Sequence, residues 1–327
     1  MGVFMVEEKW LPQDIHPRMR VISDNDYSGD PDGLIQLAHL ILSRSVETTA
    51  IIGTRLRVGD PWNNSQDSVG DAVVAAQRIV DLCHLEKSPP IFRGADLPLA
   101  DRKTPIHSPG ALEIVREAMR EDTQLPLYVV CGASLTEVAS AWLIEPKIAE
   151  RLTVIWIGGH EHEGLATPPP GGTDMEYNLH VDVIAGQVVF NDSNLKLWQV
   201  PRDSYRSLNA SRAEMKARMF GAGELGRHLY NKLGEVVEML NKYGINAGES
   251  YILGDSPLTL LTALQSTFEP DPTSSDSVVI SAPNILPSGL YEKNPIGRPI
   301  RVFGTLDNRL CLEDLYFKLA ELGNVYR

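Results

Sequence analysis

The sequence contains little cysteine, fewer basic than acidic residues, and no long apolar run. Its three cysteines, Cys83, Cys131 and Cys311, are widely spaced, which excludes a disulfide framework and a cysteine-based zinc signature. The net charge of −13 argues against a nucleic-acid binder, because phosphates are met by basic surfaces. No apolar run approaches the roughly 18 residues of a membrane span. We therefore expect neither nucleic acid nor a membrane as a partner.

The N-terminal residues 1–14 carry early acids and lack the basic start and apolar segment of a signal peptide. The expected location is therefore cytoplasmic. With 327 residues, 43% of them hydrophobic, the chain can bury a large core. Because we find neither an internal repeat nor a clean linker, we expect a single domain over residues 1–327. We also allow for a homo-oligomer, either a dimer or a tetramer.

Apolar strand-like runs alternate with helical patterns up to Pro201. The expected strands are 20–23, 48–53, 126–132, 152–159 and 195–200, and the expected helices are 34–44, 67–84, 109–120, 135–143 and 182–190. Later segments predict polar helices over 210–243, a strand at 300–305 and a helix over 311–322. Continuous apolar strands between helices indicate parallel strands that are covered on both faces. We therefore predict an α/β fold with an open, mostly parallel, Rossmann-like sheet, helices on both faces and a helical insertion over about residues 202–250.

The stretch VISDNDYSGDPDG, residues 21–33, places Asp24, Asp26, Asp30 and Asp32 between a predicted strand and a predicted helix. Acidic side chains at a helix start gain about 0.3–1 kcal/mol each, so capping accounts for one or two of them. Four carboxylates this close together disfavour joint ionisation. A cation that takes oxygen ligands, Ca²⁺ or Mg²⁺, would relieve the repulsion. Because ligands bind at the carboxyl ends of parallel strands, we expect a metal site there.

Two other interpretations fit part of this stretch. The spacing from Asp24 resembles the start of an EF-hand loop, but Ile35 stands at the twelfth position instead of a bidentate Glu. A strand, not a helix, is also expected before it, so the EF-hand is excluded. A haloacid-dehalogenase-type phosphatase would use Asp24 as nucleophile and Asp255 in a late Gly-Asp pair. That family expects another acid four residues later, where this chain has Thr259, so the phosphatase remains a minority alternative.

Five segments in the same order resemble the inosine–uridine nucleoside hydrolase family. The first is the aspartate stretch, which is similar to the family's strand running into D-x-D-x-x-x-D-D. The other four are PLYVVCGASLTEVASAW, RLTVIWIGG, MEYNLHVDVIAGQVVF and GDSPLTLLTAL. They are similar, in that order, to the family's P-T-G-P-L-T-N, Met-Gly-Gly, E-F-N-x-x-x-D-P-E-A-A and H-D-P-L-A segments. The resemblance runs from about residue 20 to 265, and five motifs in register make it fairly specific.

At the positions that match, the resemblance implies one bound Ca²⁺ ion and a ribose site around it. The implied metal ligands are the carboxylates of Asp26, Asp32 and Asp255 and the backbone carbonyl of Cys131. The implied substrate-binding residues are Asp30, Glu176, Asn178 and Asp255. Asp24 would support these groups from behind. Asp182 is expected only to start a helix.

The resemblance implies a Ca²⁺-dependent ribohydrolase that cleaves the N-glycosidic bond of a ribonucleoside or a related riboside. Asp26 would take a proton from a metal-bound water, because such a water is easier to deprotonate than free water. The surrounding carboxylates would stabilise the cation-like sugar of the transition state. No organic cofactor is required, and the partner is a small-molecule nucleoside or riboside. The alternative is a non-catalytic protein that binds a sugar or nucleoside with Ca²⁺.

The residue before Asp255 departs from the family pattern. It is Gly254, whereas many members have a His there that protonates a leaving purine. His160 or His162, in the segment GGHEHEG, could supply a replacement acid, although isolated histidines are more often structural. The other alternative is a leaving base that needs no acid, and the sequence leaves both open.

The aspartate stretch departs from the pattern as well. Pro31 separates Asp30 from Asp32 where the family has adjacent aspartates, so the metal register is open by one residue. "SGDPDG" also resembles a divergent, sugar-binding branch of the superfamily. In the loop after the second predicted strand, Trp62 could stack on a base or serve an interface.

Overall fold

The computed structural model describes residues 15–63, 65–173, 175–266, 268 and 274–325. Within this part of the chain, eight strands form one sheet in the order β3-β2-β1-β4-β5-β6-β12-β9. Their bounds are β1 Met19–Asn25, β2 Val46–Gly53, β3 Ile91–Arg93, β4 Leu127–Cys131, β5 Leu152–Ile157, β6 Lys196–Val200, β9 Asp276–Ser281 and β12 Pro299–Thr305. All pairings in this sheet are parallel except that of β9 with β12. The predicted open, mostly parallel α/β sheet is confirmed.

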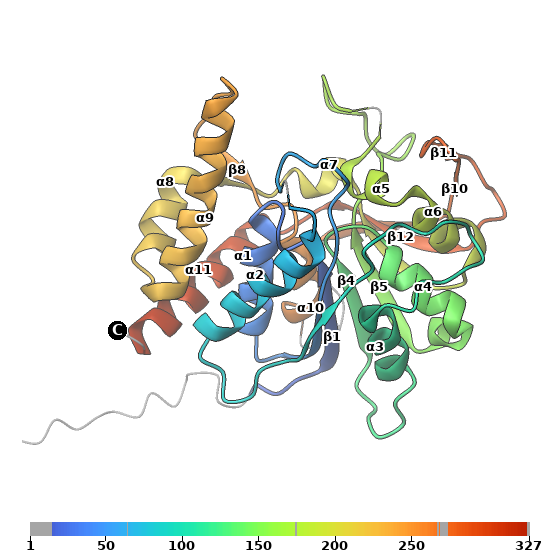
Figure 1. Ribbon diagram of the computed structural model, residues 1–327, viewed down its shortest axis with the longest axis horizontal. Coiled ribbons are helices and arrows are strands. Elements are labelled where there is room, and N and C mark those ends of the chain that lie inside the picture. The colour runs from blue at the N-terminus through green and yellow to red at the C-terminus, as the bar shows by residue number, and fades with distance from the viewer. Residues whose placement is uncertain (1–14, 64, 174, 267, 269–273, 326–327) are drawn as a thin grey trace, which may run out of the picture.

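Helices connect the strands and surround the sheet (Figure 1). Their bounds are α1 Asp32–Ile41, α2 Ser68–Leu82, α3 Pro109–Ala118, α4 Thr136–Ile144, α5 Tyr177–Val181, α6 Val183–Gln187, α7 Arg202–Tyr205, α8 Arg212–Met215, α9 Gly223–Lys242, α10 Pro257–Ala263 and α11 Asn308–Val325. Two short antiparallel pairs lie outside the main sheet. They join β7 Asn209–Ser211 to β8 Ser250–Ile252, and β10 Asn284–Ile285 to β11 Tyr291–Glu292.

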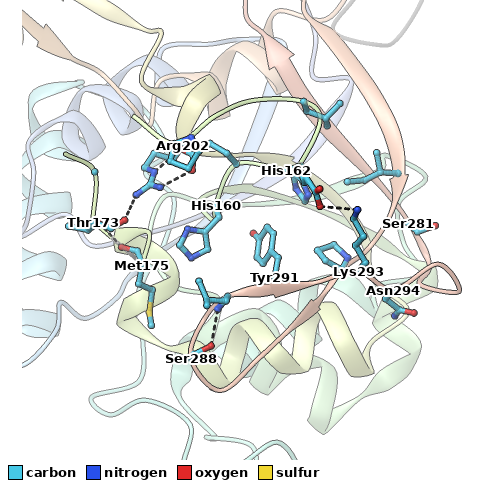
Figure 2. Close-up of a pocket in the computed structure, with 18 of the residues that line it drawn as sticks. His160, His162, Thr173, Met175, Arg202, Ser281, Ser288, Tyr291, Lys293 and Asn294 are labelled. Carbon is cyan, nitrogen blue, oxygen red and sulfur yellow. Dashed lines mark hydrogen bonds and ion pairs between the residues drawn. The ribbon is translucent and has the colours of Figure 1, made fainter. Parts of the chain in front are cut away.

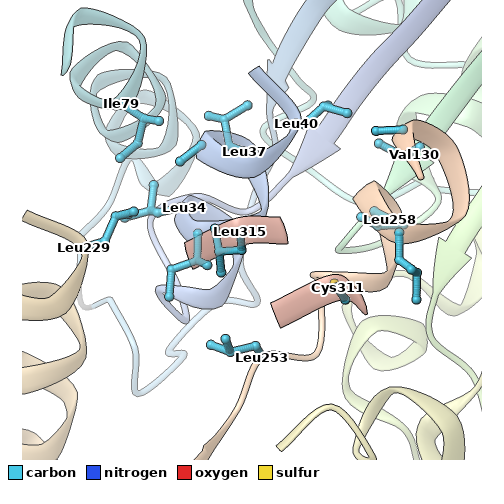
Figure 3. Packing of buried hydrophobic residues seen from close by; sticks show 14 of the residues in the cluster. Leu34, Leu37, Leu40, Ile79, Val130, Leu229, Leu253, Leu258, Cys311 and Leu315 are labelled. Atoms are coloured by element: carbon cyan, nitrogen blue, oxygen red, sulfur yellow. The ribbon is translucent and has the colours of Figure 1, made fainter. Parts of the chain in front are cut away.

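The core has two parts, one on each face of the sheet. Successive side chains of a strand point to opposite faces, so Val21 of β1 packs in one cluster and Ile22 in the other. The first cluster contains apolar side chains from α1, α2, α9, α10 and α11, and Figure 3 shows Leu37 of α1 and Leu315 of α11 within it. The second cluster contains side chains from α3, α4 and α6. Helices therefore cover both faces, as predicted.

The predicted helix over 182–190 is present as α6 and the π-helical turn Val188–Asp192 that continues it, and a separate short helix, α5, precedes it. α5 ends at Val181 and α6 begins at Val183, because the carboxylate of Asp182 accepts the backbone N–H of Ala185 and caps α6. Asp182 is therefore a helix-starting residue, as expected. The structure also contains β3, β9 and α10, which the sequence pattern did not predict.

The segment predicted as a helical insertion carries α7, α8 and the long helix α9. The buried face of α9 includes Leu225, Leu229 and Leu233, which belong to the same cluster as Leu315 and Leu319 of α11. The long helix α9 therefore packs on the same core as α11, and the single domain over residues 1–327 stays a prediction. Among the described helices, none combines the length and the apolar character that crossing a membrane requires.

Candidate active site

An acidic cavity lies at the carboxyl edge of the sheet. β1 ends at Asn25, β4 at Cys131 and β5 at Ile157, and parallel pairing of β4 with both other strands brings these ends together. The segment before α10 contributes Asp255. The cavity has a volume of about 280 Å³. Its lining residues are Asp26, Asp30, Asp32, Trp62, Gly132, Ile157, Glu176, Tyr177, Asn178, Tyr205, Arg206, Ile252, Gly254 and Asp255.

Hydrogen bonds join the first loop to the segment before α10. Nδ2 of Asn25 donates to Oδ2 of Asp255 at 2.9 Å, and the backbone N–H of Asp255 donates to Oδ2 of Asp32 at 3.1 Å. The hydroxyl of Tyr251 donates to Oδ1 of Asp30 at 2.7 Å, and the N–H of Asp32 donates to the same oxygen at 3.2 Å. The four carboxylates predicted around the metal and ribose therefore meet in one cavity.

Burial and mutual repulsion raise the pKa values of these carboxyl groups. For Asp26 and Asp32, burial is the largest cause, and the neighbouring carboxylates add to it, so each pKa lies well above its usual range. Burial also raises the pKa of Asp30 to about 6 and that of Asp255 to about 7. Acids that resist joint ionisation in this way favour the binding of a cation among them.

The cavity fits a Ca²⁺ ion by charge and by donor type, because hard cations prefer carboxylate and carbonyl oxygens. Cys131 is fully buried, and burial raises the pKa of its thiol, while the next residue, Gly132, lines the cavity. In the described part of the chain, no three side chains of His, Cys, Asp or Glu already form a metal cage. Side-chain rotation would therefore have to complete a ligand set around an ion.

Glu176 and Asn178 form the wall beside the carboxylates. The carboxylate of Glu176 accepts the backbone N–H groups of Asn178, Leu179 and Gly159 and the hydroxyl of Tyr205, at 2.7–3.1 Å. Burial raises the pKa of Glu176, and these hydrogen bonds oppose the rise. Nδ2 of Asn178 donates to the carbonyl of Gly132, directly after β4, and to that of Ile157, the last residue of β5. Both predicted residues line the cavity, and both also fix its wall.

Asp24 does not line the acidic cavity and is completely buried. Burial raises its pKa well above the usual range, the neighbouring Glu137 raises it further, and the thiol of Cys131 opposes this weakly. A carboxylate in this position cannot attack a phosphate. This burial argues against the phosphatase alternative, which needed Asp24 as an accessible nucleophile. The supporting role of Asp24 behind the cavity stays a prediction.

His160 and His162 line a second, larger cavity and not the acidic one (Figure 2). They follow Gly159, whose φ of 85° turns the chain at the end of β5. A Cβ atom at Gly159 would lie 2.1 Å from the hydroxyl oxygen of Tyr291, so only glycine fits there. The hypothesis that either histidine protonates the leaving group is not supported by this placement.

Gly254 stands at the position where many members of the family have a histidine. It lines the cavity, and a Cβ atom built there would lie 3.3 Å from Oδ2 of Asp32 and 3.3 Å from Cδ2 of Tyr205. A larger side chain would therefore require these neighbours to shift.

Asp182, predicted to be only a helix start, does not line the cavity. Its carboxylate instead accepts hydrogen bonds from the backbone N–H of Leu99 and the hydroxyl of Thr136.

Sequence reasoning missed a fifth aspartate beside the cavity. Asp60 is fully buried and accepts the hydroxyl of Tyr177 at 2.7 Å and the backbone N–H of Trp62 at 3.0 Å. Repulsion from Asp60 contributes to the raised pKa of Asp26. Trp62 lines the cavity, as its proposed contact with a base requires. The segment GDPWNN followed a strand, and that position could have drawn attention to Asp60.

Tyr205 and Arg206 were missed as well. They stand at the end of α7, which follows β6, so the carboxyl-edge rule could have found them. Tyr205 donates to Glu176, and Arg206 is exposed at the cavity and lies near Asp203. Among the described lining residues, Arg206 is the single basic side chain.

Comparisons with known proteins agree with this geometry. Residues 21–279 match the model of the family described as inosine-uridine preferring nucleoside hydrolase. A protein of that description from Crithidia fasciculata is 30% identical over 102 residues, which cover 31% of this chain and 30% of the relative. One from Leishmania major is 29% identical over 92 residues, 28% of each chain. The aligned part thus spans less than a third of these curated relatives.

Solved structures share the fold over nearly the whole chain. A purine-preferring ribonucleoside hydrolase from Gardnerella vaginalis has a TM-score of 0.71 at 16% identity, with 94% of this chain and 99% of that chain covered. A plant nucleoside hydrolase has a TM-score of 0.70 at 15% identity, with 93% and 99% covered. The family match spans most of the sequence. It includes all five motifs at the carboxyl edge of the sheet, from the one with Asp24 to the one with Asp255. The chain therefore belongs to the inosine-uridine preferring nucleoside hydrolase family.

Proposed function

We propose that this protein hydrolyses the N-glycosidic bond of a ribonucleoside or a related riboside in a Ca²⁺-dependent reaction. The observation that carries the proposal is the meeting of Asp26, Asp30, Asp32 and Asp255 in one cavity beside Glu176. Membership of the family and the names of the related proteins support a nucleoside as the substrate. The cavity volume of about 280 Å³ leaves room for a sugar-sized group.

The residues that would hold Ca²⁺ are Asp26, Asp32 and Asp255, together with the carbonyl of Cys131. When bound, the ion would supply a Lewis acid that makes water easier to deprotonate and a positive charge that orients ribose hydroxyls. Burial, and then repulsion from the other carboxylates, raises the pKa values of Asp26 and Asp32, and this repulsion supports the assignment. The ion would also neutralise part of the negative charge that the cavity concentrates.

Asp26 is the general base in this proposal. It lines the cavity at the end of β1, and its backbone N–H is fixed by a 2.8 Å hydrogen bond to Oδ1 of Asn25. Its carboxylate can accept the proton of the attacking water, and such general-base assistance contributes typically about 10²–10⁴-fold to a rate. Departure of the nucleobase leaves a cation-like sugar, which the surrounding carboxylates stabilise.

The remaining residues would bind the sugar. Asp30 would accept ribose hydroxyls while Tyr251 holds its other side by a hydrogen bond. Glu176 and Asn178 would face the 5′ side, since both line the same wall. Trp62, at the cavity's edge, would contact the nucleobase of the substrate.

An assay with a panel of ribonucleosides tests the proposal. The purified chain is incubated with inosine, uridine, adenosine or cytidine, with and without a chelator, and the released reducing sugar is measured. We expect release that the chelator abolishes and added Ca²⁺ restores. A protein that binds ribose with Ca²⁺ but cleaves nothing would establish the alternative, a non-catalytic binder that lost its leaving-group acid.

Location and assembly are proposals as well. The three cysteines are free and buried, which agrees with a reducing, cytoplasmic location. A homodimer or homotetramer would be detected by light scattering on the purified chain.

A further inference from the structure

Asn25, the last residue of β1, joins two of the residues proposed to hold Ca²⁺. Its side chain is completely buried and does not line the acidic cavity. Nδ2 of the amide donates a 2.9 Å hydrogen bond to Oδ2 of Asp255, and Oδ1 accepts the backbone N–H of Asp26 at 2.8 Å. One neutral side chain therefore connects the loop after β1 with the distant segment before α10.

The hydrogen bond from Asn25 occupies one oxygen of the Asp255 carboxylate. Among the described residues, none donates a hydrogen bond to the other oxygen, Oδ1, and Asp255 lines the acidic cavity. Oδ1 is therefore available to a ligand in the cavity. The neighbouring carboxylates of Asp26 and Asp32 cannot replace Asn25, because an ionised carboxylate accepts hydrogen bonds and donates none.

Two glycines make room for the Asn25 amide. A Cβ atom at Gly132 would lie 2.2 Å from Nδ2 of Asn25, and one at Gly33 would lie 3.0 Å from the same atom and 3.2 Å from Oδ2 of Asp255. Neither glycine has a positive φ. Gly33 also lies inside α1, where glycine is less favourable than alanine by about 0.5–1 kcal/mol. The close approach of the amide, and not the backbone conformation, therefore accounts for both glycines.

Hydrogen bonds that fix the orientation of metal ligands affect the affinity for the metal. Removal of such a partner typically lowers metal affinity about 10–100-fold. Asn25 has this relationship to two ligands at once, because it binds the side chain of Asp255 and the backbone of Asp26.

We propose that Asn25 is a positioning residue, which holds Asp255 and Asp26 in the arrangement that binds Ca²⁺. Its amide occupies one oxygen of Asp255 and leaves the other to the ion, and Gly33 and Gly132 keep the amide in place. This role rests on the Ca²⁺ site proposed above.

Asn25→Ala tests the role, and Asn191→Ala is the matched control. Asn191 lies outside the acidic cavity and also uses both ends of its amide, since Nδ2 donates to the carbonyl of Ile285 at 2.9 Å and Oδ1 accepts the N–H of Ile285 at 2.8 Å. Both substitutions should lower the free energy of unfolding, measured by urea denaturation without Ca²⁺. Only Asn25→Ala should also lower the Ca²⁺ affinity of the folded protein, by about 10–100-fold in a calorimetric titration.

Two outcomes of this titration separate the role of Asn25 from the Ca²⁺ site itself. If the unmodified chain and Asn25→Ala bind Ca²⁺ with equal affinity, the proposal is overturned and the Ca²⁺ site remains. If the unmodified chain binds no Ca²⁺, both are overturned.

Gly132→Ala tests the same contact with Asn25 still present, and it replaces Asn25→Ala if that variant does not fold. The added Cβ atom should displace the amide and lower Ca²⁺ affinity by a similar factor, whereas in the Asn25→Ala background it has room and should have little further effect. Gly234→Ala is the control, because a Cβ atom at Gly234 of α9 would meet no atom within 4 Å. Unchanged affinity in Gly132→Ala, or a loss equally large in both backgrounds, would overturn the proposal.

Discussion

The backbone N–H of Asp255 donates a 3.1 Å hydrogen bond to Oδ2 of Asp32, across 223 positions of the sequence. Asp32 begins α1, and Asp255 stands two residues before α10 begins. The pair therefore assembles the acidic cavity from two distant segments, and it forms only when both helices have packed. Asn25 strengthens the same junction by donating to Oδ2 of Asp255 at 2.9 Å.

The first prediction is that Asp32→Ala and Asp255→Ala each lose bound Ca²⁺. Each substitution removes one of the buried carboxylates whose repulsion the ion would relieve. Elemental analysis of the gently purified proteins, followed by calorimetric titration with Ca²⁺, measures the loss. We expect about one equivalent of metal in the unmodified chain and a large drop in affinity in both variants.

Asp182→Ala is the control for metal loss. This substitution removes the cap of α6 and two further hydrogen bonds, so it should cost about 2–4 kcal/mol of stability. It leaves the acidic cavity intact and should keep the metal. Unmodified protein that holds no divalent metal would contradict the assignment of the site.

The second prediction separates chemistry from binding at Asp26. Asp26→Asn should lower kcat by about 10²–10⁴-fold, because an amide cannot take the proton of water. Its oxygen can still face the cation, so KM for the riboside should change little. Steady-state kinetics on the best substrate of the panel measure both constants. Turnover equal to that of the unmodified chain would show that another residue is the base.

Much of the sheet and its acidic edge could be predicted from the sequence, because both depend on local signals. Buried parallel strands such as β1 and β4 are continuous apolar runs, and the aspartates that follow β1 mark its carboxyl end. β9 was missed because it is a mostly exposed edge strand in a Gly/Pro/Ser-rich region, where no buried pattern marks it. Its antiparallel pairing with β12 depends on tertiary contacts.

The site residues divide in the same way. Asp26, Asp30 and Asp32 lie in one short stretch, so their clustering was visible in the sequence. Asp60 and Arg206 come from separate loops, and only the folded chain brings them to the cavity. His160 and His162 follow β5 and were expected at the same edge, but the turn at Gly159 directs them into a different cavity.

The third prediction concerns pH and His39, which joins α1 to α11. The ring is fully buried, and its Nε2 lies 2.7 Å from Oδ2 of Asp314. Desolvation lowers the pKa of His39 below 6.5, and the bond to Asp314 offsets this only partly. The unfolded chain therefore binds the proton more readily, and the contribution of His39 to stability is present above about pH 6.5 and lost as pH falls through the lowered pKa.

His39→Gln isolates this contribution, because the amide can still donate to Asp314 and does not titrate. The free energy of unfolding of both proteins is measured by urea denaturation between pH 8 and pH 5. The unmodified chain should lose stability relative to the variant as pH falls. A difference between the two proteins that stays constant over this range would contradict a lowered pKa.

The last prediction concerns the leaving group. Gly254 offers no proton, and His160 and His162 line a separate cavity, so a nucleobase that needs protonation should depart slowly. A nitrophenyl riboside, whose leaving group needs no acid, should therefore be cleaved faster than inosine, by up to the 10²–10⁴-fold that a general acid typically supplies. His160→Ala and His162→Ala should leave the ratio of the two kcat/KM values unchanged. If either variant depressed inosine cleavage far more than cleavage of the nitrophenyl riboside, that imidazole would have to reach the acidic cavity, contrary to its position in the structure. Fast inosine cleavage that neither substitution affects would instead place the acid on another residue of the cavity wall.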